Sequence, residues 1–492
     1  MEKYASWSKE DLIRRIVSLE SAEGADNKME HDSKNEIDRS SDVSSDKKQG
    51  SKKARPFDMS KYHQRRVAFK VAYFGWAYAG FARQGNEKDI PTVEGQILNA
   101  LMTTKLITDL ENCNYSRCGR TDKGVSALGQ VIALDVRSNV SPDGDEKANA
   151  TELPYVETLN RLLPPDIRIL AWAPVSSTFN ARFDCNSRTY RYYFAKGDLD
   201  IERMREALQY FGGTHDFRNF CKLDPSKNIV NYERTVLDID LIPAKDEFPG
   251  TSPRQTTSHS NDYDMWYLQL KGTAFLWHQV RCMMAILFLI GQGLESPAII
   301  KDLVDIGKYN SKPEYNMASE LPLVLYDCEF EPIPWRFSGL ENSLWNEREG
   351  GLMLDGRVLQ TVGAGGTYAL QPQDTSSTSD SAPLRLYEHL QSQWQVHHIK
   401  SLLIANLIND SQSFRVPIPL SQPHNPPLTA LATLAELLQL GVKRKATDIP
   451  HGGGQTSRTH RYIKLQDRPR CDSDDTKKQK YSRKKQKVQS AA

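Results

Sequence analysis

A single carboxylate set between two cations and two glycines is the feature of the sequence best suited to chemistry. It is Asp122, which stands between Arg120 and Lys123, with Gly119 and Gly124 on either side. The glycines allow a tight turn that bulkier residues would resist, and the neighbouring cations favour the ionised acid. An ionised, positioned aspartate can act as a nucleophile or a base. In isolation such a turn is more often a simple cap, so this short pattern leaves both interpretations open.

Two sets of alternating strands and helices must position this carboxylate. Hydrophobic periodicity and capping residues predict a first set with strands at 67–74 and 131–136 and helices at 92–101 and 155–163. The second set has strands at 188–194, 235–241, 265–271 and 322–330 and helices at 201–211 and 276–291. The sequence has no repeat of fixed short period, so we expect an α+β protein whose two halves share a sheet.

The chain of 492 residues is longer than one hydrophobic core usually organises, so two packed halves with flexible flanking segments are expected. The predicted order is an amphipathic helix at 1–20, a disordered linker at 21–64, halves at 65–183 and 184–335, a flexible insertion at 336–384, a helical extension at 385–442 and a basic tail at 443–492. The linker is predicted from its scarcity of apolar residues, and the tail from the run KKQKYSRKKQKV.

Composition argues against a membrane protein. The most apolar stretch, Met283 to Ile290, is too short to span a bilayer, and the N-terminus has no apolar signal region. The net charge of +2 selects no partner by itself. We therefore expect an intracellular protein with no membrane partner.

The cysteines predict neither a disulfide framework nor a metal site. There are seven, an odd number, and none forms a C-x-x-C pair. We expect reduced thiols that are mostly buried.

The longer context of Asp122 resembles one enzyme family. The segment GRTDKGVSA at 119–127 is similar to the signature loop of the TruA family of tRNA pseudouridine synthases. Further similar blocks follow in family order between about residues 65 and 330: VAYFGWAYAGFARQ, TVEGQILNAL, NARFDCNSRTYRYYF, GGTHDFRNFCK, FLWHQVRCM and LPLVLYDCEF. Together they make the turn-cap interpretation of Asp122 the weaker one.

The resemblance implies a cofactor-free isomerisation of uridine to pseudouridine in tRNA. The N1–C1′ bond breaks, the uracil turns, and C5 joins C1′ without redox change or added atoms. Within the family, NFCKLD at 219–224 and DRPRCDS at 467–473 are most similar to the eukaryotic branch that modifies positions 38 and 39 of the anticodon stem. Alternatives are the branch acting on positions 27 and 28 or on other RNA, an inactive tRNA-binding protein, and a purely structural scaffold.

Three residues gain catalytic roles from the resemblance. Asp122 is the implied nucleophile, attacking either the base or C1′. Arg281 matches the arginine that pairs with this aspartate, although an arginine on a helix more often lies on a solvated face. Tyr190 matches the tyrosine that stacks on the target base and helps remove the C5 proton, although strand aromatics are more often core. His278 receives no role, because a lone histidine on an apolar helix is usually structural.

Other residues gain binding roles. Arg120 corresponds to the arginine that assists base flipping, and Leu323 and Leu325 would form an apolar wall of the pocket. The cations expected to hold phosphates, each also consistent with an exposed residue of no specific function, are Lys123, Arg117, Arg188 and Arg191.

The resemblance also implies an architecture and a setting. Each half would have a ferredoxin-like or RRM-like topology, with one continuous, mainly antiparallel sheet and a catalytic cleft at the junction. Bacterial relatives are homodimers, so a homodimer is one option here. The basic tail suits a nuclear import signal, a tRNA-phosphate clamp or a solvated tail without function, and we expect the protein in nucleus and cytoplasm.

Overall fold

The structure is a computed structural model that describes residues 57–84, 90–140, 152–227, 229–244, 265–336 and 447–489, with shorter pieces between 343 and 433. The expected helix at 1–20 and the linker up to residue 56 lie outside the described residues. Most of the expected insertion at 336–384 and extension at 385–442 also lies outside them.

Nine strands form one sheet in the order β4-β1-β3-β9-β5-β8-β7-β6, with β2 paired to β3. Their bounds are β1 His63–Tyr73, β2 Ser116–Arg117, β3 Ser126–Ser138, β4 Ile167–Pro174, β5 Ser187–Ala195, β6 Gly213–Asp216, β7 Glu233–Pro243, β8 Met265–Gly272 and β9 Leu323–Glu329. Every pair is antiparallel except β3 with β9. This confirms an α+β fold with one continuous, mainly antiparallel sheet.

Helices from each half contribute to two separate hydrophobic cores. Their bounds are α2 Val93–Thr103, α3 Tyr155–Asn160, α4 Ile201–Leu208, α5 Gln279–Gly291 and α6 Ile299–Val304. Thr92 caps α2 by accepting a hydrogen bond from Gly95 N at 3.2 Å. Every residue of α5 is buried, so the helix is a central element of the second core.

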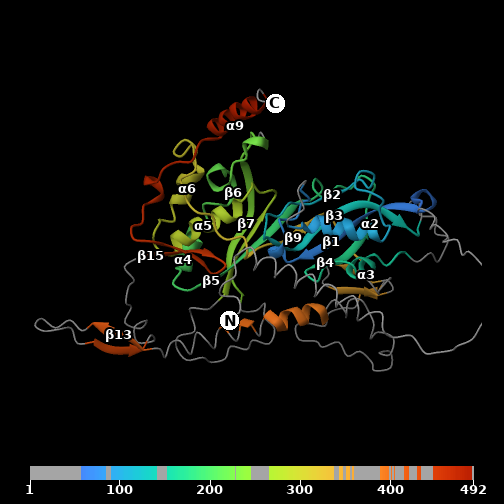
Figure 1. Ribbon diagram of the computed structural model, residues 1–492, viewed down its shortest axis with the longest axis horizontal. Helices are drawn as coiled ribbons and strands as arrows, with labels where there is room; N and C mark the ends of the chain where they lie inside the picture. Colours follow the sequence, from blue (N-terminus) through green and yellow to red (C-terminus); the bar gives the residue numbers. More distant parts are fainter. Residues whose placement is uncertain are drawn as a thin grey trace, which may run out of the picture. The chain divides into compact units, whose positions relative to one another are not determined.

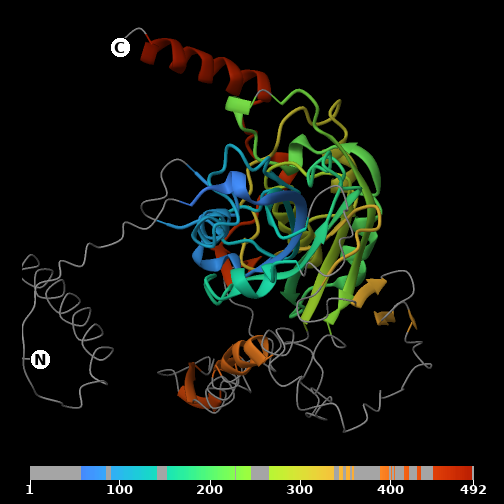
Figure 2. The same cartoon turned by 90° about the vertical axis from the view of Figure 1, so that its right-hand side faces the viewer.

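The two halves meet where β3 runs beside β9. The register pairs Ser126 with Val324 and Ala127 with Leu325. The other edge of β9 pairs with β5. Figure 1 shows β9 between the strands of the first half and those of the second, and Figure 2 shows the second-half strands, drawn in green, as one curved layer. Tyr190 of β5 packs against both cores. The loop carrying Asp122 therefore leads directly into the strand that joins the halves.

Order begins earlier than the predicted boundary at residue 65. A 3-10 turn occupies Met59–Lys61, and β1 starts at His63. The rings of Phe57 and Tyr62 stack with centroids 5.2 Å apart, and the Arg137 guanidinium lies 5.2 Å from the Tyr62 ring. These contacts order a segment that has too few apolar residues to be recognised by composition.

Residues 447–471, expected as part of a basic tail, instead pack on the second half. The strands β15 Thr447–Gly452 and β16 Gln455–Thr459 form a hairpin, and His451 O accepts from Ser319 N at 2.6 Å. Leu465 is fully buried, and the buried Glu295 accepts from Leu465 N at 2.7 Å and from the Tyr462 hydroxyl at 2.6 Å. One buried side chain, Leu465, and a few hydrogen bonds hold this segment on the second half. A prediction from composition does not detect such isolated contacts.

The basic run itself is helical. It lies in α9 Asp474–Gln489, near the end of the chain (Figure 1). In the described part of the chain, none of the helices has the length and apolar character needed to cross a bilayer.

Candidate active site

Asp122 lies in a cleft of about 1100 Å³ that both halves line. The first half contributes an unbroken run, residues 115–122, and the second half contributes residues 273–280 together with parts of β5 and β9. The cleft is therefore at the junction of the halves, where the sequence analysis placed it.

The loop that carries Asp122 is held by the connection between β1 and α2. Phe81 N donates to Thr121 O at 3.1 Å, and Gly124 N donates to Tyr78 O at 3.3 Å. The buried Tyr73 hydroxyl is 2.8 Å from Thr121 Oγ1. The connection between β1 and α2 thus holds the loop through direct backbone hydrogen bonds and one side-chain contact.

Steric demands fix the same loop. A Cβ added to Gly75 would lie 2.0 Å from Val125 O, and one added to Gly124 would lie 2.7 Å from Glu320 Cγ. Gly124 also has a φ of +79°, which favours glycine. A Cβ on Gly119 would meet nothing within 4 Å, so the expectation that both flanking glycines shape the turn is right for Gly124 alone.

Two side chains at the start of α5 contact the Asp122 carboxylate. Trp277 Nε1 donates to Asp122 Oδ1 at 3.1 Å, and His278 Nε2 is 3.5 Å from Oδ2. The Asp122 side chain keeps 29% of its surface exposed to the cleft. It is thus held on one side and accessible on the other.

The charge of Asp122 depends on groups of the second half. Burial raises the pKa of its carboxyl above the ordinary value, while the Arg281 charge, the Trp277 hydrogen bond and the charges of Lys227 and Lys222 counteract part of that rise. The sequence analysis assigned this effect to the adjacent Arg120 and Lys123. The structure corrects that assignment, because the acting cations come from distant segments.

Arg281 is buried, but its ion pair is with another carboxylate. Its Nε donates to Ala318 O at 2.7 Å, and its Nη2 donates to Glu320 Oε2 at 2.8 Å. Its charge still lowers the pKa of Asp122. The structure thus brings the predicted pair close together, with Glu320 in the position of direct partner.

His278 is strained and neutral. It has a left-handed backbone with a φ of 62°, and α5 begins directly after it. Burial and the charges of Arg281, Lys222 and Lys312 lower its pKa to about 4. Its buried Nδ1 makes no hydrogen bond with the described residues. The sequence analysis gave this residue no role, and the structure places it against the carboxylate.

Tyr190 and Leu323 give the cleft an apolar wall. The Tyr190 ring meets Phe275 edge to face at 5.1 Å, and burial raises the pKa of its phenol far above the ordinary value, so the hydroxyl stays protonated. Leu325, expected beside Leu323, is fully buried in the first core and does not line the cleft.

Positive charge dominates the cleft lining. Seven Lys or Arg side chains line it against two carboxylates, Asp122 and Asp224; the seven are Arg117, Arg120, Arg182, Arg188, Lys222, Lys227 and Arg234. Such an excess of cations suits the phosphates of a nucleic acid.

The predicted phosphate contacts divide into two groups. Arg117 and Arg188 line the cleft but are engaged by the protein, Arg117 with Glu94 and Arg188 with Thr273 O at 2.7 Å. Arg120 is exposed at the cleft. Lys123 and Arg191 do not line it, and the Arg191 guanidinium lies 3.5 Å from the Tyr326 ring centroid.

Three neighbouring cleft residues, Trp277, Lys222 and Lys227, are among those that the sequence did not predict. Trp277 is 38% exposed, and the Nζ atoms of Lys222 and Lys227 lie 4.7 Å and 5.8 Å from its ring centroid. Two of the three stand inside the blocks GGTHDFRNFCK and FLWHQVRCM. The available signal was an indole and a lysine inside blocks that also resemble the family.

The amino-acid sequence of the chain is similar to that of known proteins. Residues 207–331 match the family model described as tRNA pseudouridine synthase. The chain is 46% identical over 335 residues to the tRNA pseudouridine(38/39) synthase of Homo sapiens, covering 66% of this chain and 67% of that protein. It is 45% identical over 339 residues to the Saccharomyces cerevisiae protein of the same name, covering 68% and 73%.

A further relative is less similar and matches a shorter stretch of this chain. The tRNA pseudouridine synthase A of Thermococcus onnurineus is 35% identical over 271 residues, which are 55% of this chain and 87% of that protein. This chain belongs to the TruA-type family of tRNA pseudouridine synthases.

Proposed function

We propose that this protein converts uridine to pseudouridine at positions 38 and 39 of the tRNA anticodon stem-loop, with Asp122 as the nucleophile. The observation that carries the proposal is a half-buried carboxylate held by Trp277 and His278 inside a cleft lined by seven cations. The choice of positions is supported by the names of the human and yeast relatives.

The target uridine must leave the stem before Asp122 can reach it. A base that swings out of its stack loses stacking energy of a few kcal/mol, and an aromatic surface in the pocket offsets part of that loss. Tyr190 and Phe275 supply such a surface beside Asp122. Arg120 is exposed at the cleft and is suited to brace the vacated site.

The reaction conserves every atom of the uridine. Asp122 forms a bond either to C1′ of the ribose or to the uracil ring, and the N1–C1′ bond breaks. The retained uracil turns so that C5 bonds to C1′, the bond to Asp122 breaks and frees the carboxylate, the C5 proton leaves, and N1 gains a proton. Tyr190 is proposed to assist removal of the C5 proton by holding the uracil in place, because its ring lines the same cleft; its phenol, whose pKa burial raises far above the ordinary value, is not itself the base.

Recognition of the RNA rests on its backbone. Lys222 and Lys227 line the cleft beside Trp277, Arg234 lines the same cleft, and these cations would neutralise phosphates on either side of the target nucleotide. Folded RNA is read largely through shape and backbone contacts. A tRNA stem-loop is therefore a better fit than a long single strand.

The proposal extends to topology and setting. Each half would be a ferredoxin-like unit, supported by the strand orders β4-β1-β3-β2 and β9-β5-β8-β7, in which helices α2 and α3 or α4 and α5 connect the strands. The basic helix α9 supports import into the nucleus as well as a cytoplasmic pool. A homodimer is proposed from the bacterial members of the family.

The decisive experiment uses Asp122→Asn, which keeps the shape of the side chain and removes its nucleophilic charge. Purified protein is incubated with tRNA transcripts, and pseudouridine is mapped nucleotide by nucleotide after carbodiimide labelling. Wild type should convert positions 38 and 39, and Asp122→Asn should lose at least about a thousandfold in rate. Asp109→Asn changes a partly exposed carboxylate of the same half, outside the cleft, and should behave as wild type.

Three results would contradict the proposal. Activity retained by Asp122→Asn would remove the nucleophile assignment. Conversion at positions 27 and 28 in place of 38 and 39 would overturn the choice of positions. A wild-type protein that binds tRNA but modifies none would be an RNA-binding protein instead.

A further inference from the structure

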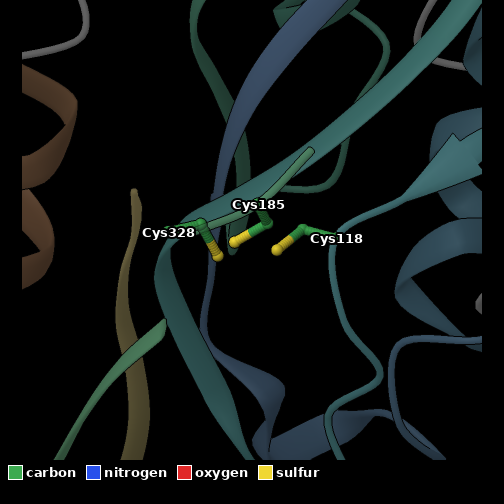
Figure 3. Close-up of side chains that lie close together, drawn as sticks. All are labelled: Cys118, Cys185 and Cys328. Atoms are coloured by element: carbon green, nitrogen blue, oxygen red, sulfur yellow. The ribbon is translucent and has the colours of Figure 1, made fainter. Parts of the chain in front are cut away.

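Three thiols from distant parts of the chain meet beneath the catalytic loop. The Sγ atoms of Cys118, Cys185 and Cys328 all lie within 4.8 Å of one another, and Figure 3 shows the three side chains pointing toward a common centre. Each residue is more than nine-tenths buried. Because they are far apart in the sequence, the fold and not a local motif brings them together.

Each thiol belongs to a different structural segment at the junction of the halves. Cys118 follows β2 and begins the loop that leads to Asp122, Cys185 precedes β5, and Cys328 is in β9. Cys118 and Cys185 also line the catalytic cleft. The cluster is thus buried, yet it adjoins a space through which a small ion can enter.

This grouping is specific within the chain. Among the residues that the structure describes, these three are the one set of at least three His, Cys, Asp or Glu whose ligand atoms lie close enough to share a metal ion. The other cysteines, Cys113, Cys221, Cys282 and Cys471, belong to no such set there. Abundance of cysteine in the core does not by itself account for the cluster.

The spacing suits three sulfurs around one ion. A sulfur-to-metal bond of about 2.3 Å places the sulfurs of a trigonal site about 4 Å apart. The observed separations, all within 4.8 Å, need only small side-chain adjustments to reach that value. The backbone would not have to move far.

The donor set selects the kind of ion. Thiolates favour soft ions such as Cu(I), whereas structural zinc sites are four-coordinate. In the described part of the chain, no His, Asp or Glu joins the three cysteines as a fourth ligand. Three thiolates without a fourth protein ligand fit a soft monovalent ion in trigonal coordination.

A positive side chain is already in place beside the cluster. Three thiolates and one monovalent cation carry a net charge of −2, which is costly to bury without a counter-charge. Arg188 is the cross-strand partner of Cys328, and its Nη2 donates to Cys118 O at 2.9 Å. Its guanidinium would offset part of the negative charge and orient the loop that carries one of the ligands.

We propose that Cys118, Cys185 and Cys328 bind one soft monovalent ion of the Cu(I) type, with Arg188 as the counter-charge. Binding replaces three S–H bonds with three S–metal bonds and releases three protons to solvent, without a change of oxidation state. The ion would tie the catalytic loop, the start of β5 and β9 to one point. The proposal concerns the thiols alone and does not depend on which tRNA positions are modified.

The test titrates the reduced full-length protein with Cu(I) under nitrogen, in competition with a coloured Cu(I) chelator. Wild type should withdraw one equivalent of Cu(I) from the chelator. Cys118→Ser, Cys185→Ser and Cys328→Ser should each lose that equivalent. Cys113→Ser, which alters a buried thiol of the first core outside the cluster, should retain it. Circular dichroism of every variant verifies that its fold is intact.

A second measurement needs no substitution. In the wild-type protein, Cu(I) should protect the three clustered cysteines from alkylation, as read by mass spectrometry, and leave Cys113 and Cys221 unchanged. X-ray absorption at the copper edge should show three sulfur neighbours. Protection spread evenly over all cysteines, an equal loss in Cys113→Ser, or a spectrum with nitrogen or oxygen ligands would each overturn the proposal.

Discussion

The two walls around Asp122 hold it by different means. The first half acts through backbone, since Thr121 O and Gly124 N are both hydrogen-bonded to the β1–α2 connection and Gly75 packs directly on Val125 O. The second half acts through side chains at the start of α5, namely Trp277, His278 and Arg281.

This difference separates position from charge. Backbone contacts fix where the carboxylate lies, and a change there should cost stability and activity together. Side-chain dipoles and charges decide whether the carboxylate is ionised, and a change there should alter the pH dependence of the reaction. The comparison predicts distinct outcomes for substitutions in the two walls.

Among substitutions in the two walls, the largest effect is expected for Arg281→Gln, which removes charge from the second wall. Burial already raises the pKa of Asp122, and the Arg281 charge opposes that rise. Activity that needs the ionised acid falls as the pH drops through this pKa, so the variant should lose activity at a higher pH than wild type. At neutral pH we expect a loss of about 100-fold in single-turnover rate, typical for removal of one preorganised charge.

Glu320→Gln is the matched variant, because it breaks the same ion pair and keeps the Arg281 charge. The acid limb of its pH–rate profile, where the rate falls as the pH drops, should move in the opposite direction, toward lower pH. The reason is that a negative charge that competes with ionised Asp122 has been removed. If both variants moved the limb the same way, the second wall would not control the charge of Asp122. Single-turnover rates measured across the pH range give both answers.

The second prediction addresses the first wall. Gly75→Ala should destabilise the protein by about 2 kcal/mol, because its Cβ would lie 2.0 Å from Val125 O and backbone would have to shift. Gly119→Ala places its Cβ in open space and should leave the denaturation midpoint near that of wild type. Equal midpoints for Gly75→Ala and wild type would show that the close approach is not needed.

The sheet was largely predictable because hydrophobic runs coincide with its central strands. The predicted strands at 67–74 and 188–194 correspond to β1 and β5, and the predicted helix at 92–101 corresponds to α2. The edge strand β4 and the hairpin β15–β16 were missed. The hairpin gains its order from contacts with Ser319, Gln292 and Tyr192, and such long-range partners leave no periodic signal in the sequence.

The site residues were predictable where the motif is local. The prediction failed where residues from distant segments come together. Asp122, Tyr190 and Leu323 line the cleft as expected. Arg191 follows Tyr190 in β5, and neighbouring strand residues point to opposite faces, so it does not line the cleft. The cysteine cluster was not foreseen, because spacing in the sequence says nothing about thiols from three separate segments.

The smallest effect is expected for Trp277→Phe, which keeps an aromatic ring in the second wall and removes one hydrogen-bond donor. The Trp277 N–H stabilises the ionised form of Asp122, so its loss should raise the pKa and move the acid limb upward, in the same direction as Arg281→Gln. One such hydrogen bond at a part-exposed carboxylate contributes about 1 kcal/mol, or about fivefold in rate on the acid side. Trp76→Phe removes an indole N–H that bonds Leu321 O at 3.4 Å, outside the cleft, and should leave the pH profile unchanged. A Trp277→Phe profile that kept its shape while the melting temperature fell would assign this residue to position and not to charge, and the separation between the two walls would fail there.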